Sequence, residues 1–358
     1  MATRRIENRE RLEMNDPRIA LSFVTSPNHH FPGHPESPER FDGFNRLLQG
    51  KLQDYLELVE TRSNGADTRA AVQLAHSKDY IVAIEDAMSQ APLFLDYGDT
   101  YATPHSYDCA LEAVAGTLAM LKPIQDGAAT HGFALVRPPG HHANQNQAMG
   151  FCLFNNIAIA TKTLQESGYA KVAIYDFDVH HGNGTQDIFE SDPDVLFIST
   201  HQSGIYPGSG YQTEVGKDSG EGSIINIPLP AYTGDQGFMK VFEHIIQPAV
   251  DRFNPDFLLI SAGFDAHWSD PLANLQLSTN GYFQMTQKII QLAESNCEGR
   301  LGLLLEGGYD PEALADNVEA VLTGLAGRSP PQDRLGPAPI DEPVIDNLIR
   351  EIRSIHAL

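Results

Sequence analysis

The sequence predicts an α/β fold with a mostly parallel central sheet and helices on both of its faces. Short apolar runs such as VLFIST and FLLIS alternate with longer stretches whose apolar residues recur every three or four positions. These are the patterns of buried strands and of amphipathic helices. Strands without polar alternation are typical of a parallel sheet covered on both sides. No repeat of fixed period interrupts this order.

The first half of the chain divides at its proline and glycine clusters. A charged arm covers residues 1–18, and a loop over 91–104 precedes a long alanine-rich helix. The expected elements are a strand from Ala20, a helix over 40–49, a strand near Leu56, one or two helices within 67–90, a helix from near His105 that stops before Pro123, a strand over 132–136 and a helix that ends at Ser167.

Strands and helices alternate regularly in the second half. The proline-rich segment 327–339 is the expected linker, so we predict an arm (1–18), one domain (19–326), and a linker with a terminal helix docked on that domain (327–358). The expected elements are strands at 171–178, 195–200, 223–229, 257–264 and 300–308, and helices at 185–190, 235–253, 279–296 and from Pro311.

The composition is that of an ordinary globular protein, with 41% hydrophobic and 20% charged residues. The 358 residues include 24 basic and 47 acidic side chains, a net charge of −23. Without a basic excess the chain cannot displace counterions from phosphates, so we expect no nucleic-acid partner. The acidity suits cationic substrates, although it also serves solubility alone.

The cysteines and the N-terminus indicate the cellular context. Cys109, Cys152 and Cys297 are odd in number and far apart, which favours reduced thiols over disulfides or a zinc finger. The N-terminal arm mixes acids with arginines and has no apolar run, unlike a secretory signal. No stretch approaches the roughly 20 apolar residues that span a bilayer. We therefore expect a soluble cytoplasmic protein with no membrane contact.

The segment KVAIYDFDVHHGNGT, residues 171–185, joins an apolar strand to a cluster of acids, histidines and glycines. Asp176, Asp178 and His180 are spaced two apart, so on a strand their side chains would share one face. The carboxyl ends of parallel strands are where α/β proteins form their sites. We therefore expect three metal-binding or hydrogen-bonding groups here, with a solvated loop as the alternative.

A second acidic strand end supplies a further ligand, because the run FLLISAGFDAH delivers Asp265. With Asp178 and His180 it makes three protein ligands and leaves a position for water, as in a catalytic rather than a structural zinc site. Two carboxylates and one imidazole are harder ligands than those of most zinc sites, so iron could compete. A lone aspartate at a strand end is alternatively a cap or an ion-pair partner.

Two more strand ends carry groups suited to acid–base chemistry. RPPGHHA holds His141 and His142 on a rigid loop, as ligands, bases or packed core residues. In LEGGYD, Gly307 and Gly308 precede Tyr309, whose hydroxyl could donate to an oxyanion beside a metal. A tyrosine after two glycines is alternatively a simple turn residue.

The motifs RPPGHHA, DFDVHHGNGT, SAGFDAH and LEGGYD, in this order, closely resemble those of the histone deacetylase superfamily. The resemblance runs from about Ser22 to about Gly324 and implies a single-domain arginase/deacetylase-like fold. It implies that one zinc ion is bound by Asp178, His180 and Asp265. It also implies that His142 acts as general base and then general acid, and that Tyr309 stabilises the oxyanion.

The resemblance further implies that Asp176 supports His141 and that Asn183 lies behind His142, where many class I relatives carry aspartate. An amide there should leave His142 less basic, the pattern of class II and bacterial members. The implied channel wall and rim residues are Asp99, Gly150, Phe151, Tyr206, Leu272 and Gly307, with Arg40 near an internal cavity. The implied K⁺ or Na⁺ sites consist of Asp176, Asp178, His180, Ser199 and Thr200 (inner), and of Phe189, Asp192, Val195 and Ser223 (outer).

These roles imply a zinc-dependent amidohydrolase that removes acetyl or another short acyl group from a small acylated amine or an acetyl-lysine substrate. Acetylpolyamine amidohydrolases, the nearest alternative, tend to place a glutamate where this chain has Leu272. A two-manganese ureohydrolase needs carboxylates where Gly182 and His267 stand. A non-catalytic acetyl-lysine-binding module would be expected to lack a ligand, His142 or Tyr309. Whether the protein forms a homo-oligomer is left open by the sequence.

Overall fold

The computed structural model describes residues 18–44, 55–59 and 66–358. Its centre is an eight-stranded sheet of order β2-β1-β5-β10-β9-β6-β7-β8, in which every strand pair is parallel. The predicted parallel α/β sheet is therefore confirmed. The strands are β1 (Ile19–Val24), β2 (Leu56–Leu58), β5 (His131–Val136), β6 (Val172–Asp176), β7 (Val195–Gln202), β8 (Ile224–Leu229), β9 (Phe257–Ala262) and β10 (Leu301–Leu305).

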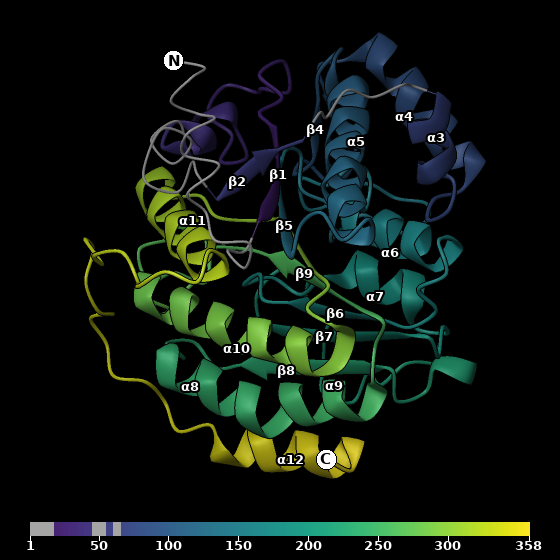
Figure 1. Cartoon of the computed structure of the whole chain (residues 1–358). Helices are drawn as coiled ribbons and strands as arrows, with labels where there is room; N and C mark the ends of the chain where they lie inside the picture. Colours follow the sequence, from purple (N-terminus) through teal and green to yellow (C-terminus); the bar gives the residue numbers. More distant parts are fainter. Residues whose placement is uncertain (1–17, 45–54, 60–65) are drawn as a thin grey trace, which may run out of the picture.

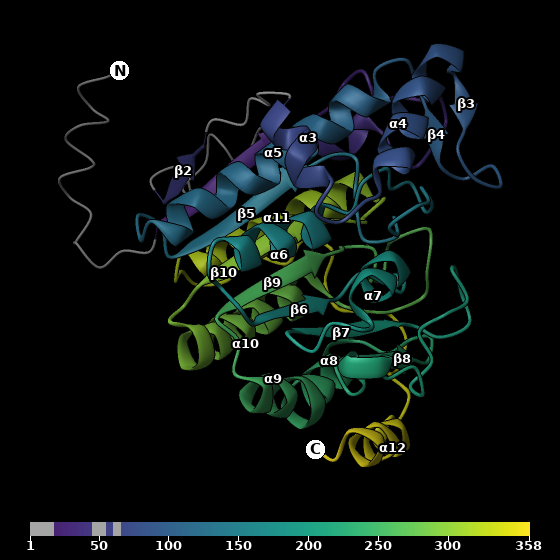
Figure 2. The ribbon, with the colours of Figure 1, turned by 90° about the vertical axis from the view of Figure 1, so that its right-hand side faces the viewer.

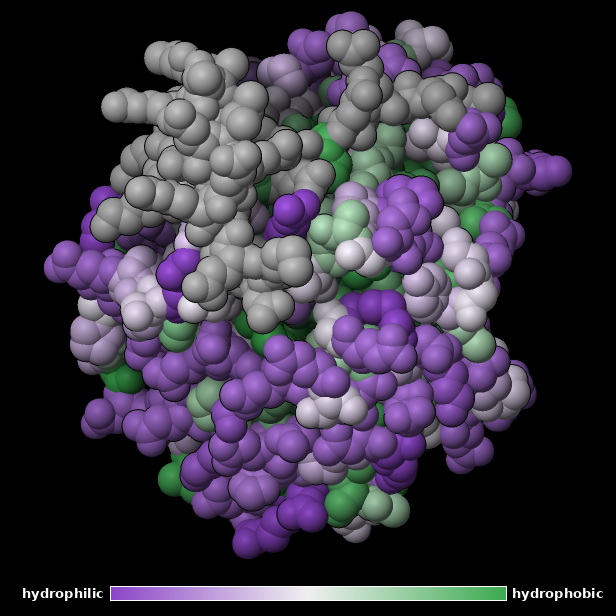
Figure 3. Space-filling model, viewed as in Figure 1, coloured by the Kyte–Doolittle hydropathy of each residue, from purple (hydrophilic) through white to green (hydrophobic). Residues whose placement is uncertain are grey.

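Helices cover both faces of this sheet, as Figures 1 and 2 show. One face carries α3 (Ala66–Val72), α4 (Lys78–Ala87), α5 (Ser106–Gln125), α6 (Asn156–Glu166) and α7 (Asn183–Phe189). The other carries α8 (Asp235–Val241), α9 (Gln247–Phe253), α10 (Thr279–Cys297), α11 (Pro311–Leu325) and α12 (Asp346–His356). The surface over α8 and α10 is mostly hydrophilic in Figure 3.

Strands β1 and β5 to β10 each contribute to two apolar cores because their side chains alternate between faces. In β9, Leu258 and Ile260 belong to the core under α8–α12, whereas Leu259 belongs to the core under α3–α7. All three side chains are buried. This two-sided burial explains why the strands read as continuous apolar runs, and it leaves the strand ends as the places where polar side chains gather.

Helix α12 lies against the α8–α9 side of the domain (Figure 1). Ile349 and Ile352 of α12 are buried in the main apolar core. The carboxylate of Glu342 accepts hydrogen bonds from the backbone N–H groups of Gly234, Gln236 and Gly237, at 2.8–2.9 Å. A carboxylate at the positive N-terminal end of α8 is electrostatically favourable.

Several expected boundaries were wrong. Helix α5 does not stop before Pro123 but continues to Gln125, because burial of Leu121 and Ile124 in the apolar core outweighs the backbone hydrogen bond that Pro123 cannot donate. The expected loop 91–104 contains an antiparallel pair, β3 (Leu93–Phe94) and β4 (Tyr101–Ala102). The stretch 235–253 is divided by a π-helical turn at Phe242–Ile246.

Two expectations fall partly outside the described residues. The predicted helix over 40–49 begins as a 3-10 turn at Pro38–Phe41, and residues 45–49 lie outside the description. The same holds for residues 1–17 of the predicted arm. No helix in the described part of the chain is long and apolar enough to cross a bilayer.

Candidate metal and catalytic site

Three possible metal ligands meet beyond the ends of β6 and β9. The expectation that Asp176, Asp178 and His180 share one strand face was wrong, because β6 ends at Asp176. The Asp176 carboxylate accepts the N–H of Asp178 at 3.0 Å, and this bond turns the chain into a loop. On this loop, Asp178 and His180 each place one ligand atom within 4.8 Å of the others and of a carboxylate oxygen of Asp265.

This ligand set fits a divalent cation. The Asp178 and Asp265 carboxylates are buried, and each has an oxygen 3.2 Å from His180 Nδ1. Asp265 Oδ2, the oxygen that lies near His180 Nδ1, has no other polar partner within the described residues. Burial opposes the charged form of His180, but the two carboxylates raise its pKa to about 10. Two buried carboxylates beside one imidazole need a positive charge, which a metal ion would supply.

The backbone next to these ligands is packed against them. Gly307 N–H donates to Asp178 Oδ2 at 2.8 Å, and Val179 N–H donates to Asp265 Oδ1 at 2.9 Å. A side chain at Gly307 would collide with the Asp178 and Asp265 carboxylates. Glycine is therefore required at 307 by the close approach of the backbone to the ligands.

The two histidines of RPPGHHA lie side by side after β5, with ring centroids 4.0 Å apart. His141 Nδ1 donates to Asp176 Oδ2 at 3.0 Å. Burial disfavours the imidazolium of His141, but Asp176 and Asp178 outweigh burial and raise its pKa to about 10. Asp176 therefore lies behind His141 and stabilises a positive charge on it.

The environment of His142 has the opposite effect on its pKa. Its Nδ1 lies 2.8 Å from Asn183 Oδ1, while Asn183 Nδ2 points to the sulfur of Met149 at 3.3 Å. The amide orientation makes His142 Nδ1–H the donor, so Nε2 is left unprotonated. Burial and the charges of His141 and His180 hold the pKa of His142 well below its usual range. A neutral imidazole with a free Nε2 can act as a proton acceptor.

Aromatic rings line the approach to these groups. The Tyr206 ring lies 5.1 Å from that of His142, and the Phe151 ring lies 5.7 Å from that of Tyr309. A side chain at Gly150, where φ is +55°, would collide with the His142 ring. Burial raises the pKa of the Tyr309 hydroxyl well above 10, so that hydroxyl stays protonated and can donate.

The expected rim residues lie on two separate loops. Asp99 precedes β4, and its carbonyl accepts a hydrogen bond from His34 Nε2 at 3.0 Å. The His34 ring packs edge-on against Phe151, with centroids 4.7 Å apart, which links the Asp99 loop to the aromatic wall. Leu272 follows β9 and is 38% exposed.

The residues expected to bind monovalent cations divide into two groups. Asp176 and Ser199 are register partners on β6 and β7, and Thr200 Oγ1 donates to the Asp176 carbonyl at 3.4 Å. At the expected outer site, which also includes Val195 and Ser223, Lys162 supplies a positive charge. Its ammonium lies 2.8 Å from Asp192 Oδ2 and 4.9 Å from the centre of the Phe189 ring.

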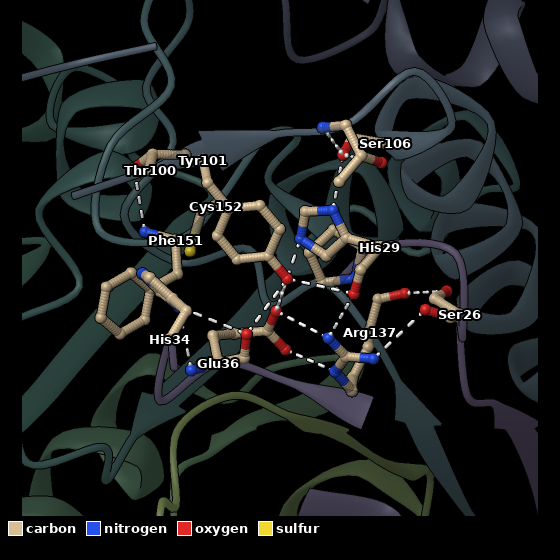
Figure 4. A network of polar contacts seen from close by, with 12 residues as sticks. Ser26, His29, His34, Glu36, Thr100, Tyr101, Ser106, Arg137, Phe151 and Cys152 are labelled. Atoms are coloured by element: carbon tan, nitrogen blue, oxygen red, sulfur yellow. Dashed lines mark hydrogen bonds and ion pairs between the residues drawn. The ribbon is translucent and has the colours of Figure 1, made fainter. Parts of the chain in front are cut away.

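A buried ionic network supports the site, and the sequence interpretation missed most of it (Figure 4). Glu36 accepts hydrogen bonds from Arg137 Nε at 2.5 Å and Nη2 at 2.9 Å, and from Arg40 Nη1 at 3.3 Å. Burial alone would raise the pKa of Glu36, but Arg137 and His29 hold it well below its usual range. The sequence contained a feature that could have predicted this network. Charged residues stand inside PESPER, RPPGHHA and LEGGYD, and each of these motifs lies beside a strand or turn end.

The family model of the histone deacetylase domain matches residues 34–325, a span that includes the ligands, both histidines and Tyr309. The chain belongs to the histone deacetylase family. Its fold is that of the family: the crystal structure of the HDA15 HD domain aligns with it at a TM-score of 0.84 and 34% identity, covering 95% of this chain and 94% of that one. The predicted family and arginase/deacetylase-like fold are confirmed.

Similar proteins include relatives from a plant, an archaeon and a bacterium. This chain is 39% identical to "Histone deacetylase 14, chloroplastic" of Arabidopsis thaliana, over 97% of this chain and 86% of that protein. It is 39% identical to "Probable deacetylase" of Archaeoglobus fulgidus, over 83% and 82%. It is 36% identical to "Histone deacetylase-like amidohydrolase" of Pseudomonas aeruginosa, over 85% and 80%. The protein is therefore a deacetylase-family hydrolase.

Proposed function

We propose that this deacetylase is a zinc-dependent amidohydrolase that removes acetyl or another short acyl group from acetyl-lysine-like amines. The observation that carries this proposal is the convergence of Asp178, His180 and Asp265 next to His142, whose Nδ1 is bound by Asn183. A three-ligand metal site beside a neutral imidazole is the arrangement that metal-assisted hydrolysis needs. Membership in the family supports the same reaction class.

The metal would be held by Asp178, His180 and Asp265. Bound Zn²⁺, or Fe²⁺ in the cell, supplies Lewis acidity that polarises the amide carbonyl and lowers the pKa of water. His142 accepts the proton of the attacking water at Nε2 and then gives it to the leaving amine. Tyr309 donates a hydrogen bond to the oxyanion. The products are a short carboxylic acid and a free amine.

The other proposed roles concern binding. Asp176 orients His141 through its 3.0 Å hydrogen bond, and Asn183 keeps the Nδ1 proton of His142 in place. The rings of Phe151 and Tyr206 would hold the alkyl chain of the substrate, with Gly150 and Gly307 leaving it room, and Asp99 would bind the substrate backbone at the rim. K⁺ or Na⁺ would lie beside Asp176, Ser199 and Thr200.

Acetyl-lysine is favoured over an acetylpolyamine because the exposed rim residue Leu272 carries no charge. A second cationic group on a long polyamine would gain nothing from an apolar side chain there. The net charge of −23 is the observation that keeps acetylpolyamines as the second candidate.

Release of a fluorophore from an acetyl-lysine amide by the pure protein tests the reaction. Turnover should stop after chelation and return with Zn²⁺. Asp265→Asn should lose metal affinity, whereas Asp251→Asn, at an exposed acid of α9, should behave as wild type. Absence of metal-dependent turnover would favour a binding module. A comparison of kcat/KM for acetyl-lysine peptides, longer acyl-lysines, acetylputrescine and acetylspermidine tests the substrate, and a strong preference for the polyamines would overturn the acetyl-lysine assignment.

A further inference from the structure

Glu306 carries a buried carboxylate next to the histidine loop. The reaction described above assigns no role to this carboxylate. It follows β10 directly and is 1% exposed. Its Oε2 accepts the backbone N–H groups of Gly140 at 2.7 Å and His141 at 3.1 Å. Its Oε1 accepts the hydroxyl of Ser261, on β9, at 2.9 Å. One side chain thus connects the end of β10 with the histidine loop after β5 and with the neighbouring strand β9.

The backbone N–H and carbonyl groups of Glu306 also form hydrogen bonds. Its N–H donates to the Ala262 carbonyl at 3.0 Å, and its carbonyl accepts from Arg40 Nη2 at 2.6 Å. The same guanidinium donates from Nε to the Gly308 carbonyl at 2.7 Å and lies 4.9 Å from the centre of the Tyr309 ring. Glu306 therefore joins the Tyr309 segment and the histidine loop through hydrogen bonds.

These contacts fix His141 from two sides. Its N–H is bound by Glu306, and its Nδ1 is bound by Asp176. His142 is the next residue, so the direction in which its imidazole leaves the backbone depends on how the backbone of His141 is held. Proton transfer needs the base within hydrogen-bond reach of the water, and a misplacement of about 1 Å can cost about 100-fold in rate.

We propose that Glu306 is a positioning residue for the tandem histidines: by binding the Gly140 and His141 amides it sets the place of His142 Nε2 beside the metal ligands. The inference rests on the proposed function, in which His142 is the base. The hydrogen bonds of the Glu306 carboxylate go to Gly140, His141 and Ser261 and not to His142. Its effect on turnover must therefore pass through the loop.

Substitution at 306 and 142 in a double-mutant cycle tests the inference, with kcat and KM measured on the acetyl-lysine substrate. Glu306→Ala leaves two buried N–H groups unpaired, so kcat should fall about 10- to 100-fold while KM stays within about twofold. Glu306→Gln keeps one oxygen acceptor and should recover most of that loss. In a His142→Ala background, Glu306→Ala should cause no further loss, because the base that it positions is gone.

Three results would overturn the inference: an unchanged kcat in Glu306→Ala, an equal loss in the His142→Ala background, or no recovery in Glu306→Gln. If Glu306→Ala does not fold, Ser261→Ala removes the third hydrogen bond alone and should show a smaller loss of kcat that likewise vanishes without His142. The control Glu342→Gln, at a carboxylate that also accepts backbone N–H groups but lies on the tail, should keep wild-type kcat.

Crystal structures of the 306 variants separate this inference from the proposed function. The 3.0 Å His141–Asp176 contact should be lost in Glu306→Ala and kept in Glu306→Gln. An inactive wild type would refute the proposed function, and the structures alone would then decide whether Glu306 positions the loop. An undisplaced histidine loop in Glu306→Ala would refute the positioning role whatever the activity.

Discussion

His142 Nδ1 lies 2.8 Å from the amide oxygen of Asn183. A carboxylate at this position would stabilise the imidazolium more strongly than an amide and would raise the pKa of His142. Because the base must be unprotonated, Asn183→Asp should move the acid limb of kcat/KM to higher pH, by about one unit. Asn347→Asp, on the exposed surface of α12, is the control. An acid limb that stays in place would contradict the assignment of His142 as the base.

Loss of the Tyr309 hydroxyl should reduce turnover without releasing the metal. Tyr309→Phe keeps the ring that packs against Phe151 and Arg40, so kcat should fall about 100- to 1,000-fold, as for other oxyanion donors. Metal content measured by atomic absorption should equal that of wild type. Tyr97→Phe, at a fully exposed tyrosine, should be unchanged. Normal turnover of an ordinary acetyl-lysine substrate by Tyr309→Phe would exclude the oxyanion role.

His76 should make the fold sensitive to acid. Its Nε2 accepts the backbone N–H of Asn155, the N-cap residue of α6, at 2.8 Å, and burial lowers its pKa from 6.5 to about 4. The unfolded chain therefore binds a proton between pH 6.5 and 4 that the folded chain excludes. Stability should fall as pH drops through this window, by at most about 3 kcal/mol from this group.

Urea unfolding at pH 7 and pH 5 measures this effect. His76→Gln, whose amide oxygen can accept the same N–H, should lose less stability between the two pH values than wild type. His244→Gln, at an exposed histidine, should show the wild-type difference. An identical pH dependence in His76→Gln would show that other groups dominate.

The Glu342 carboxylate should stabilise the docked C-terminal segment. Glu342→Ala removes three hydrogen bonds at the N-terminal end of α8 and should lower the free energy of unfolding by about 1–2 kcal/mol. The site is formed by other elements, so kcat should stay unchanged. Unfolding by urea and steady-state kinetics check both statements. Unaltered stability would mean that the tail is held by α12 alone.

The order of strands and helices was readable from the sequence because burial on both faces gives parallel strands their continuous apolar runs. Predicted boundaries were wrong where tertiary packing outweighed a local preference. The rule that proline ends a helix did not hold at Pro123, which lies inside the last turn of α5. Asp178 and His180 were expected on a strand, although β6 ends at Asp176. The two-residue spacing suggested one face of a strand, while the hydrogen bond from Asp178 N–H to the Asp176 side chain is a contact that spacing does not reveal.

By itself the sequence determined the α/β class and, through four motifs, the family and the residues that gather at the strand ends. Only the tertiary structure decided how these residues are joined. The pairing of Glu36 with Arg137, and of Glu306 with the histidine loop, connects segments more than 100 residues apart. Such partners are chosen by strand order and by the need to neutralise buried charge, and neither is written in the local pattern of any one motif.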